Sequence, residues 1–340
     1  MKSHSRLTAL VLGLLLALAA CSGSSDDDAE GATEAGAAEG SDESADDTAT
    51  DEADESEPAD SETADDELAA EFPRVVATPT GDVAIEARPE RIVSLSATAT
   101  EMLFAIGAGE QVEAVDSFSN YPAEAPTTDL SAFEANLEAV AVHDPDLVIL
   151  GWPNDEVEAG LTQIGVPVLV LAAAVTIDGT YEQVAILGEA TGNIDAAADT
   201  NASIRAGIDE ILARVSVTDE PVRVYHELDD TFFSASSASY IGQLYELLGY
   251  ENIADAADTD GFGYPQLQVD QIIDSDPTLI VYTDAYDYDA TDIAARPGWD
   301  VLSAVSNGNI VEVNDDISSR WGPRVVDFLE LIVEAMVPAS

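Results

Sequence analysis

From Phe72 to the end of the chain, short runs rich in Val, Ile and Leu alternate with segments of helical periodicity. Strands are expected at residues 91–95, 112–115, 147–150, 166–171, 222–226, 279–282 and 310–313. Helices are expected near residues 99–106, 137–142, 157–164, 240–248, 271–273 and 325–337. Strands that alternate with helices favour parallel sheets covered by helices, so the expected fold class is α/β.

Two segments depart from this alternation. Residues 75–77 and 83–85 flank Thr80-Gly81-Asp82, a pattern that is typical of a β-hairpin. The stretch 181–215 contains no proline and predicts one long helix, although Gly192-Asn193 is a point where it could kink or break. The folded part then divides into an N-terminal α/β lobe (72–178), a rigid bridging helix (179–216) and a C-terminal α/β lobe (217–340).

The N-terminus has the pattern of an export signal. Residues 1–20 begin with two basic residues and continue with an apolar run that is too short to span a bilayer of roughly 30 Å. The run ends in Leu18-Ala19-Ala20-Cys21, which resembles the lipobox of bacterial lipoproteins. That resemblance implies cleavage before Cys21 and a lipid on its thiol, hence an extracytoplasmic protein anchored to the cell membrane. An ordinary secretory signal with an incidental cysteine is the alternative. Cys21 is the only cysteine, so no disulfide within the chain supports the fold.

Acidic residues dominate the composition. Asp and Glu number 68 against 11 Lys and Arg, a formal net charge of −57, which excludes nucleic acid as a partner because phosphates require a basic surface. Residues 21–71 have low complexity, without a basic or aromatic residue, and predict a disordered acidic linker. Self-repulsion would extend this linker into a leash between lipid and folded part. An acidic binding tail is the alternative.

Six segments together carry a family resemblance. They are RPERIVSLSATATEMLFAIGAG (88–109), VDSFSNYPAEA (115–125), NLEAVAVHDPDLVILGW (136–152), LGYENIAD (248–255), YPQLQVDQIIDSDPTLIV (264–281) and RWGPRVVDFLELI (320–332). In this order they resemble the substrate-binding proteins of ABC importers for vitamin B12, ferric siderophores and haem. The resemblance covers residues 88–336. It implies two α/β lobes joined by one long rigid helix, with the ligand in the cleft between them.

The resemblance also implies a ligand site walled by aromatic side chains, because flat apolar rings bury a large area at low entropic cost. Tyr121 matches a ligand-contacting tyrosine of the B12-binding relatives, whereas Phe133, Trp152 and Tyr264 match their tryptophans. The full set of candidate ligand-binding residues is Phe118, Tyr121, Phe133, Trp152, Glu227, Phe233, Tyr264, Arg320, Trp321 and Arg324. Core packing is the alternative for each aromatic residue. For the two C-terminal arginines it is an ion pair with Asp316 or Asp327, instead of a carboxylate- or phosphate-bearing ligand.

Partners follow from the same resemblance. Family members present one carboxylate on each lobe to basic pockets of the permease, and Glu138 and Asp270 match those positions. A solvated charge on a helix is the alternative. The expected partners are an ABC permease and its ATPase, a small metal chelate and, through the lipid, the membrane. The protein itself is expected to be a monomer without a resident cofactor.

Other classes have little support in the sequence. After removal of the signal only His143 and His226 remain as histidines, too few for the His-rich ligand sets of zinc or manganese receptors. No GxSxG, P-loop, HExxH or GxGxxG motif is present. An enzyme therefore stays a rival class that no sequence motif supports. A lipid-anchored sensor or scavenger without a permease is another rival. Among ligands, a corrinoid, a ferric siderophore and haem remain open.

Overall fold

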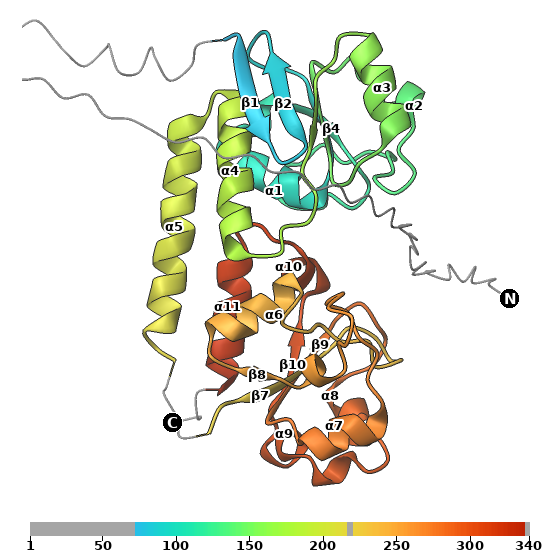
Figure 1. The fold of residues 1–340 in the computed structure, drawn as a ribbon, viewed down its shortest axis with the longest axis vertical. Helices are drawn as coiled ribbons and strands as arrows, with labels where there is room; N and C mark the ends of the chain where they lie inside the picture. Colours follow the sequence, from blue (N-terminus) through green and yellow to red (C-terminus); the bar gives the residue numbers. More distant parts are fainter. Residues whose placement is uncertain (1–71, 216–219, 337–340) are drawn as a thin grey trace, which may run out of the picture. The chain divides into compact units, whose positions relative to one another are not determined.

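The computed structural model describes residues 72–215 and 220–336 (Figure 1). The predicted signal peptide, the acidic linker and Cys21 lie outside the described residues. Two four-stranded parallel sheets form the described part, as the alternating pattern predicted.

The first sheet has the strand order β4-β3-β5-β6. Its strands are β3 (Ile92–Leu95), β4 (Val112–Val115), β5 (Leu147–Leu150) and β6 (Val168–Val170). Strands β3 and β5 are buried along their whole length, which explains why their sequences are nearly continuous apolar runs. The helices of this lobe are α1 (Ala97–Ala105), α2 (Leu137–Ala141) and α3 (Asp155–Gln163), with the 3₁₀ turn η1 (Gly109–Gln111).

The predicted hairpin is formed by β1 (Arg74–Thr78) and β2 (Gly81–Ile85), which pair antiparallel. Gly81 has a φ of +128° beside the turn, a conformation that L side chains rarely adopt. Val76 and Ile85 are buried in the hydrophobic core of the first lobe, so the hairpin belongs to that lobe.

The second sheet has the strand order β10-β9-β7-β8. Its strands are β7 (Arg223–Glu227), β8 (Glu251–Asn252), β9 (Leu279–Thr283) and β10 (Ile310–Val313). Its helices are α6 (Tyr240–Leu247), α7 (Val269–Ser275), α8 (Ala290–Ala294), α9 (Ser303–Asn307), α10 (Asp315–Ser319) and α11 (Val325–Met336), with 3₁₀ turns η2 (Ile253–Ala256) and η3 (Trp299–Val301). The sequence did not predict β8, α8, α9 or α10, each of which has five residues or fewer.

The stretch predicted as a single bridging helix is divided into α4 (Ile177–Thr191) and α5 (Ile194–Leu212), which lie side by side in Figure 1. Helix α4 ends at Gly192, whose φ of +74° is left-handed and stops the helix. A Cβ on Gly188 would lie 2.4 Å from the Ala197 methyl group, so the absent side chain lets the two helices approach closely.

Both helices contribute to both lobes. On α4, Val184 is buried in the first-lobe core and Tyr181 in the second-lobe core. On α5, Ala197 belongs to the first core, whereas Ile204 and Ile208 belong to the second. Two helices, not one, therefore connect the lobes through buried apolar contacts.

Candidate ligand-binding surface

The loops that follow the carboxyl ends of the strands of the two sheets are in contact. In the loop after β4, the Asn120 side-chain amide donates to a carboxylate oxygen of Asp316, on helix α10 after β10, at 2.7 Å. Arg320 Nη2 donates to the Phe118 carbonyl of the same loop at 2.9 Å. In parallel α/β sheets, ligands bind outside the carboxyl ends of the strands, so these loops mark the candidate site.

Three exposed aromatic rings form a first-lobe wall, namely Phe118, Phe133 and Trp152. The rings of Phe118 and Phe133 have centroids 5.2 Å apart at 87°, and those of Phe133 and Trp152 are 4.9 Å apart at 31°. Phe133 is 66% exposed and Phe118 54%, although both are large apolar side chains. Adjacent exposed aromatic rings of this kind are typical of a binding surface, because folding alone would bury them.

The backbone below Phe118 is fixed while its ring is exposed. Asp116 follows β4 and is fully buried, and its carboxylate accepts hydrogen bonds from the Phe118 amide at 2.7 Å and the Ser119 hydroxyl at 3.0 Å. Thr100 on α1 forms a further hydrogen bond with the Ser119 hydroxyl. The ring is therefore presented by a rigid loop, which reduces the entropic cost of binding.

Two helix caps place the other rings of this wall. Asn136 caps α2 by accepting from the Ala139 amide at 2.9 Å, and Phe133 lies just before it. Asn154 caps α3 by accepting from the Val157 amide, and Trp152 lies between the end of β5 and this cap. Asparagine is a preferred N-cap because its side-chain oxygen satisfies an amide that the helix leaves without a partner.

We define a second-lobe wall as the four exposed aromatic residues on the loops after strands β7, β8 and β9, namely Phe233, Phe262, Tyr264 and Tyr286. Phe233 forms an antiparallel bridge with Gln266, which brings the segment after β7 beside the segment around Tyr264. Phe262 and Tyr264 meet edge to face, with centroids 6.0 Å apart. Sequence reasoning missed Tyr286, whose only signal was its place in a Tyr-rich loop directly after a buried strand.

Asp258 holds the loop that carries Phe262 and Tyr264. Its carboxylate accepts from the Ser236 hydroxyl at 2.5 Å and from the amides of Gly263 and Phe262 at 3.0 and 3.1 Å. The Ser236 hydrogen bond, followed by those of the two amides, holds the pKa of Asp258 below its usual value. These bonds all stabilise the ionised carboxylate, so the loop is anchored at neutral pH.

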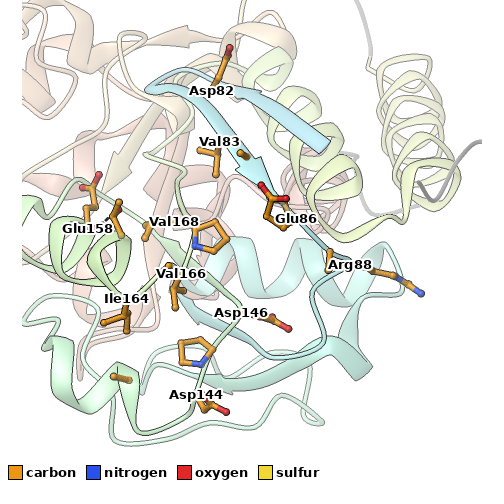
Figure 2. A pocket seen from close by; sticks show the side chains of 18 residues that line it. Asp82, Val83, Glu86, Arg88, Asp144, Asp146, Glu158, Ile164, Val166 and Val168 are labelled. Carbon is orange, nitrogen blue, oxygen red and sulfur yellow. Dashed lines mark hydrogen bonds between the residues drawn. The ribbon is translucent and has the colours of Figure 1, made fainter. Parts of the chain in front are cut away.

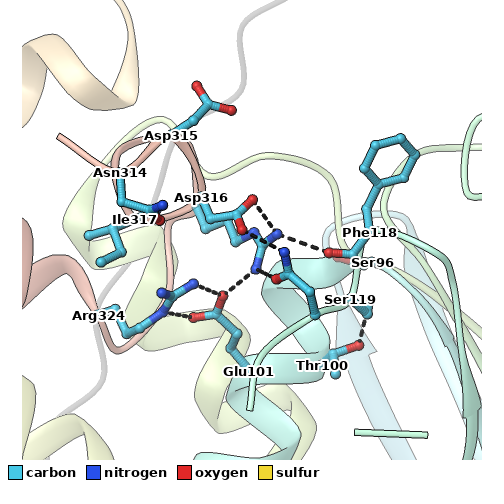
Figure 3. Close-up of polar contacts among 12 residues, drawn as sticks. Ser96, Thr100, Glu101, Phe118, Ser119, Asn314, Asp315, Asp316, Ile317 and Arg324 are labelled. Atoms are coloured by element: carbon cyan, nitrogen blue, oxygen red, sulfur yellow. Dashed lines mark hydrogen bonds and ion pairs between the residues drawn. The ribbon is translucent and has the colours of Figure 1, made fainter. Parts of the chain in front are cut away.

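Arg320 and Arg324 lie in an arginine clamp, which we define as these two residues and Glu101 (Figure 3). Glu101 on α1 is only 3% exposed and accepts from Arg320 Nη1 at 2.8 Å and from Arg324 Nε at 2.8 Å and Nη2 at 2.5 Å. Arg320 also donates to Asp316 at 2.5 Å, the partner that the ion-pair alternative named. The guanidiniums therefore join the lobes, and we leave them out of the ligand-contacting set.

Sequence reasoning missed Glu101. Its only signal was its place as a carboxylate within an otherwise apolar helical segment. Such a position indicates a charge that is both buried and paired, because buried charges in proteins normally have a partner.

Tyr121 lies beside this clamp. The Arg324 guanidinium carbon is 4.2 Å from the Tyr121 ring centroid, a cation–π contact, and the ring is still 46% exposed. A hollow of about 340 Å³ is lined here by both residues together with Phe104, Pro122 and Asp327. Tyr121 thus stays a candidate, on the side of the clamp.

Glu227 and Trp321 point into the protein. Glu227 is fully buried, and both its oxygens accept from Arg296 at 2.5 and 2.7 Å. Trp321 packs against the cores of both lobes and donates its indole N–H to Gln183 at 2.9 Å. Phe232, with a φ of +67°, turns its ring onto Trp299, away from the surface that Phe233 occupies. We therefore leave Glu227 and Trp321 out of the ligand-contacting set.

The candidate docking residues are both exposed. Glu138 lies in the first turn of α2 and Asp270 in the first turn of α7, one on each lobe. The helix dipole favours an acidic side chain in the first turn of a helix. This effect alone would explain both positions, with no need for a docking partner.

Another hollow in the described residues lies at the opposite edge of the first sheet (Figure 2). It has a volume of about 870 Å³ and lies between β2 and the segments that precede β5 and β6, including Asp146 and Val166. Because it borders the amino ends of the strands, it is separate from both aromatic walls.

No helix in the described residues has the length and apolar character needed to cross a membrane. No group of three or more His, Cys, Asp or Glu side chains there is arranged to hold a metal ion.

Comparison with known proteins gives consistent matches. The family model described as periplasmic binding protein matches residues 92–317. A cobalamin-binding protein of Halobacterium salinarum is 34% identical over 257 residues, which cover 72% of this chain and 69% of that protein. An uncharacterised ABC transporter substrate-binding lipoprotein of Bacillus subtilis is 27% identical over 266 residues, which cover 76% of this chain and 83% of that protein.

Solved structures share the fold. The vitamin B12-binding protein of Vibrio cholerae superimposes with a TM-score of 0.58 at 24% identity, covering 73% of this chain and 96% of that one. The haem-binding protein of Roseiflexus sp. RS-1 superimposes with a TM-score of 0.63 at 23% identity, covering 73% and 97%. At this identity the likeness concerns the two-lobe α/β fold alone.

Proposed function

Because the chain belongs to the periplasmic binding protein family, we propose that it is a lipid-anchored extracytoplasmic receptor that captures a bulky metal chelate for an ABC importer. Members of this family are non-enzymatic components of transport. The lipid on Cys21 is part of the proposal, supported by the lipobox-like sequence before it. A diacylated cysteine would be needed, because a single acyl chain gives only reversible membrane binding.

The observation that carries the proposal is the pair of exposed aromatic walls, which lie beyond the carboxyl ends of the strands of the two sheets. Fully burying one large aromatic side chain removes about 150–250 Å² from water, at about 25 cal/mol per Å². Several such rings match a ligand with extended apolar faces, whereas a bare metal ion would need converging polar ligands. A corrinoid is the favoured ligand, because the Halobacterium relative is named for cobalamin. A ferric siderophore is the second candidate.

Delivery to the permease is proposed to use Glu138 and Asp270. Their positions on separate lobes would let basic pockets of the permease grip both lobes at once. Ligand capture and docking would then depend on different residues, and the two steps can be separated by mutation.

The experiment is a calorimetric titration of the purified protein with cyanocobalamin and with a ferric trihydroxamate. We expect saturable one-to-one binding of at least one chelate. A Phe133→Ala variant should weaken it, because Phe133 contacts both other rings of the first-lobe wall. Val75→Ala is the control, because this apolar side chain is also 66% exposed and lies on strand β1, outside both walls. Absence of binding to both chelates would refute the proposal.

A further inference from the structure

Each arginine of the described residues contacts another residue of the same chain. Lys2 and Arg6 precede the described part, so arginine is its only cation other than histidine. The arginines contact carboxylates, carbonyls or aromatic rings: Arg74 with Phe72, Arg88 with Thr191, Arg91 with His143, Arg205 with Tyr181, Arg214 with Glu330, Arg223 with Asp276, Arg296 with Glu227, and Arg320 and Arg324 with Glu101. A negatively charged ligand would therefore find no arginine at the walls that is not already engaged.

Three carboxylates lie near Tyr286 of the second-lobe wall. Tyr286 is 39% exposed and stacks on Tyr288, with ring centroids 6.0 Å apart. Asp229, Asp230 and Asp315 lie close enough to raise the pKa of the Tyr286 hydroxyl, after the larger effect of burial.

Asp315 is in turn close to two further carboxylates, Asp316 and Asp284. Burial first, and then Asp316 and Asp284, raise the pKa of Asp315 above its usual value. Asp229 is fixed in place, since one of its oxygens accepts from the Thr231 amide at 2.8 Å and the Phe233 amide at 3.3 Å. The wall therefore combines an exposed aromatic ring with a negative potential, which Arg320 offsets only in part at Asp315.

Resting on the proposed function, we infer that the surface selects chelates without net negative charge, and that Tyr286 with Asp229, Asp230 and Asp315 contacts their amide or cationic groups. Carboxylates accept hydrogen bonds from amide and ammonium donors and repel carboxylates and phosphates, and an aromatic face attracts cations. The inference favours neutral, amide-rich corrinoids and neutral or cationic ferric hydroxamates. It disfavours haem, with its propionates, and anionic siderophores.

The test compares ligands that differ in charge on one core. The first set is cyanocobalamin, cationic aquocobalamin and a monocarboxylic acid of cyanocobalamin. The second is ferrioxamine B with its free amine, its N-acetyl form and its N-succinyl form. On whichever core binds, we expect the anionic member to bind at least about tenfold more weakly than the neutral and cationic members. This difference in affinity, called the gap below, should shrink when ionic strength rises from about 0.1 to about 1 M.

Two variants locate the effect. Asp230→Asn removes one exposed charge at the wall and should reduce the gap about threefold, since the closest charges contribute most. Asp199→Asn removes the same charge from the exposed face of α5 and should leave the gap unchanged. Circular dichroism at each salt concentration confirms that all proteins stay folded.

The outcomes separate the two proposals. Equal or tighter binding of the anionic member overturns the charge inference while leaving the proposed function intact. An equal effect of Asp199→Asn also overturns it, because the selectivity would then come from the total charge of the protein and not from this wall. Failure of every member of both sets to bind overturns the proposed function itself.

Discussion

Replacing Glu101 by glutamine should destabilise the protein by about 3 kcal/mol, because it removes the carboxylate shared by two arginines. Three charge-assisted hydrogen bonds of 2.5–2.8 Å end on its two oxygens, and the side chain is almost completely buried. Removing one partner of a buried ion pair costs about 3–5 kcal/mol. After the substitution, Arg320 would still pair with Asp316, and Arg324 would still lie against the Tyr121 ring. Because neither guanidinium would lose every partner, we expect a loss at the lower end of that range.

Thermal unfolding followed by circular dichroism measures this loss. About 3 kcal/mol corresponds to a decrease in Tm of roughly 6–12 °C for a domain of this size. The matched control is Glu330→Gln, which removes the exposed ion pair with Arg214 and should leave Tm almost unchanged. A Glu101→Gln variant as stable as Glu330→Gln would refute the clamp as a stabilising contact between the lobes.

Three further predictions test the site, a buried histidine and docking. Ligand binding should quench the fluorescence of Trp152 and not that of Trp299 or Trp321, because only Trp152 lies in an aromatic wall; a Trp152→Phe variant that still shows the full quench would contradict this. Burial lowers the pKa of His226 from 6.5 to about 3, so only the unfolded state takes up a proton between these values. Stability should therefore fall by up to about 1.4 kcal/mol per pH unit as the pH decreases below about 6.5, and urea titrations of His226→Asn should show a shallower loss. Glu138→Ala should leave chelate affinity unchanged and reduce uptake into vesicles that carry the permease and ATPase, whereas Glu156→Ala on α3 should affect neither; lost affinity in Glu138→Ala would contradict the docking role.

The sequence predicted the elements whose local pattern is strong. Strand β5 begins and ends where its apolar run indicated, because a parallel strand that is buried along its whole length needs such a run. Strand β10 also has its predicted bounds, although it is only partly buried. Strand β8 has two residues and helix α10 five, lengths at which tertiary contacts outweigh local pattern. The same holds for the division at Gly192, which the sequence marked only as a possible kink or break. In the structure the chain reverses its direction there, because α4 and α5 pack on each other.

The site was predictable where it lies next to a predicted strand. Trp152 follows β5, and Phe118 follows β4 by three residues, so the rule that ligands bind at carboxyl ends of strands placed them. The roles of Arg320 and Arg324 depend on Glu101, more than 200 residues away in the chain, and no local pattern pairs them. A cation that is rare in an acidic chain indicates only that some carboxylate will hold it. Which carboxylate holds it follows from the fold.

The clamp and the two bridging helices together constrain how this protein can respond to a ligand. Helices α4 and α5 each bury side chains in both cores, so a large rotation of one lobe would expose apolar area on both helices. The clamp adds a buried ionic contact that such a rotation would break. Arg320 also holds the Phe118 carbonyl, so the loop of the first-lobe wall is fixed to the second lobe before a ligand arrives. On the proposed function, recognition would depend on walls that are already in place. Selectivity would then arise from the chemistry of these walls, namely the aromatic area offered to the ligand and the carboxylates proposed to disfavour a negative one.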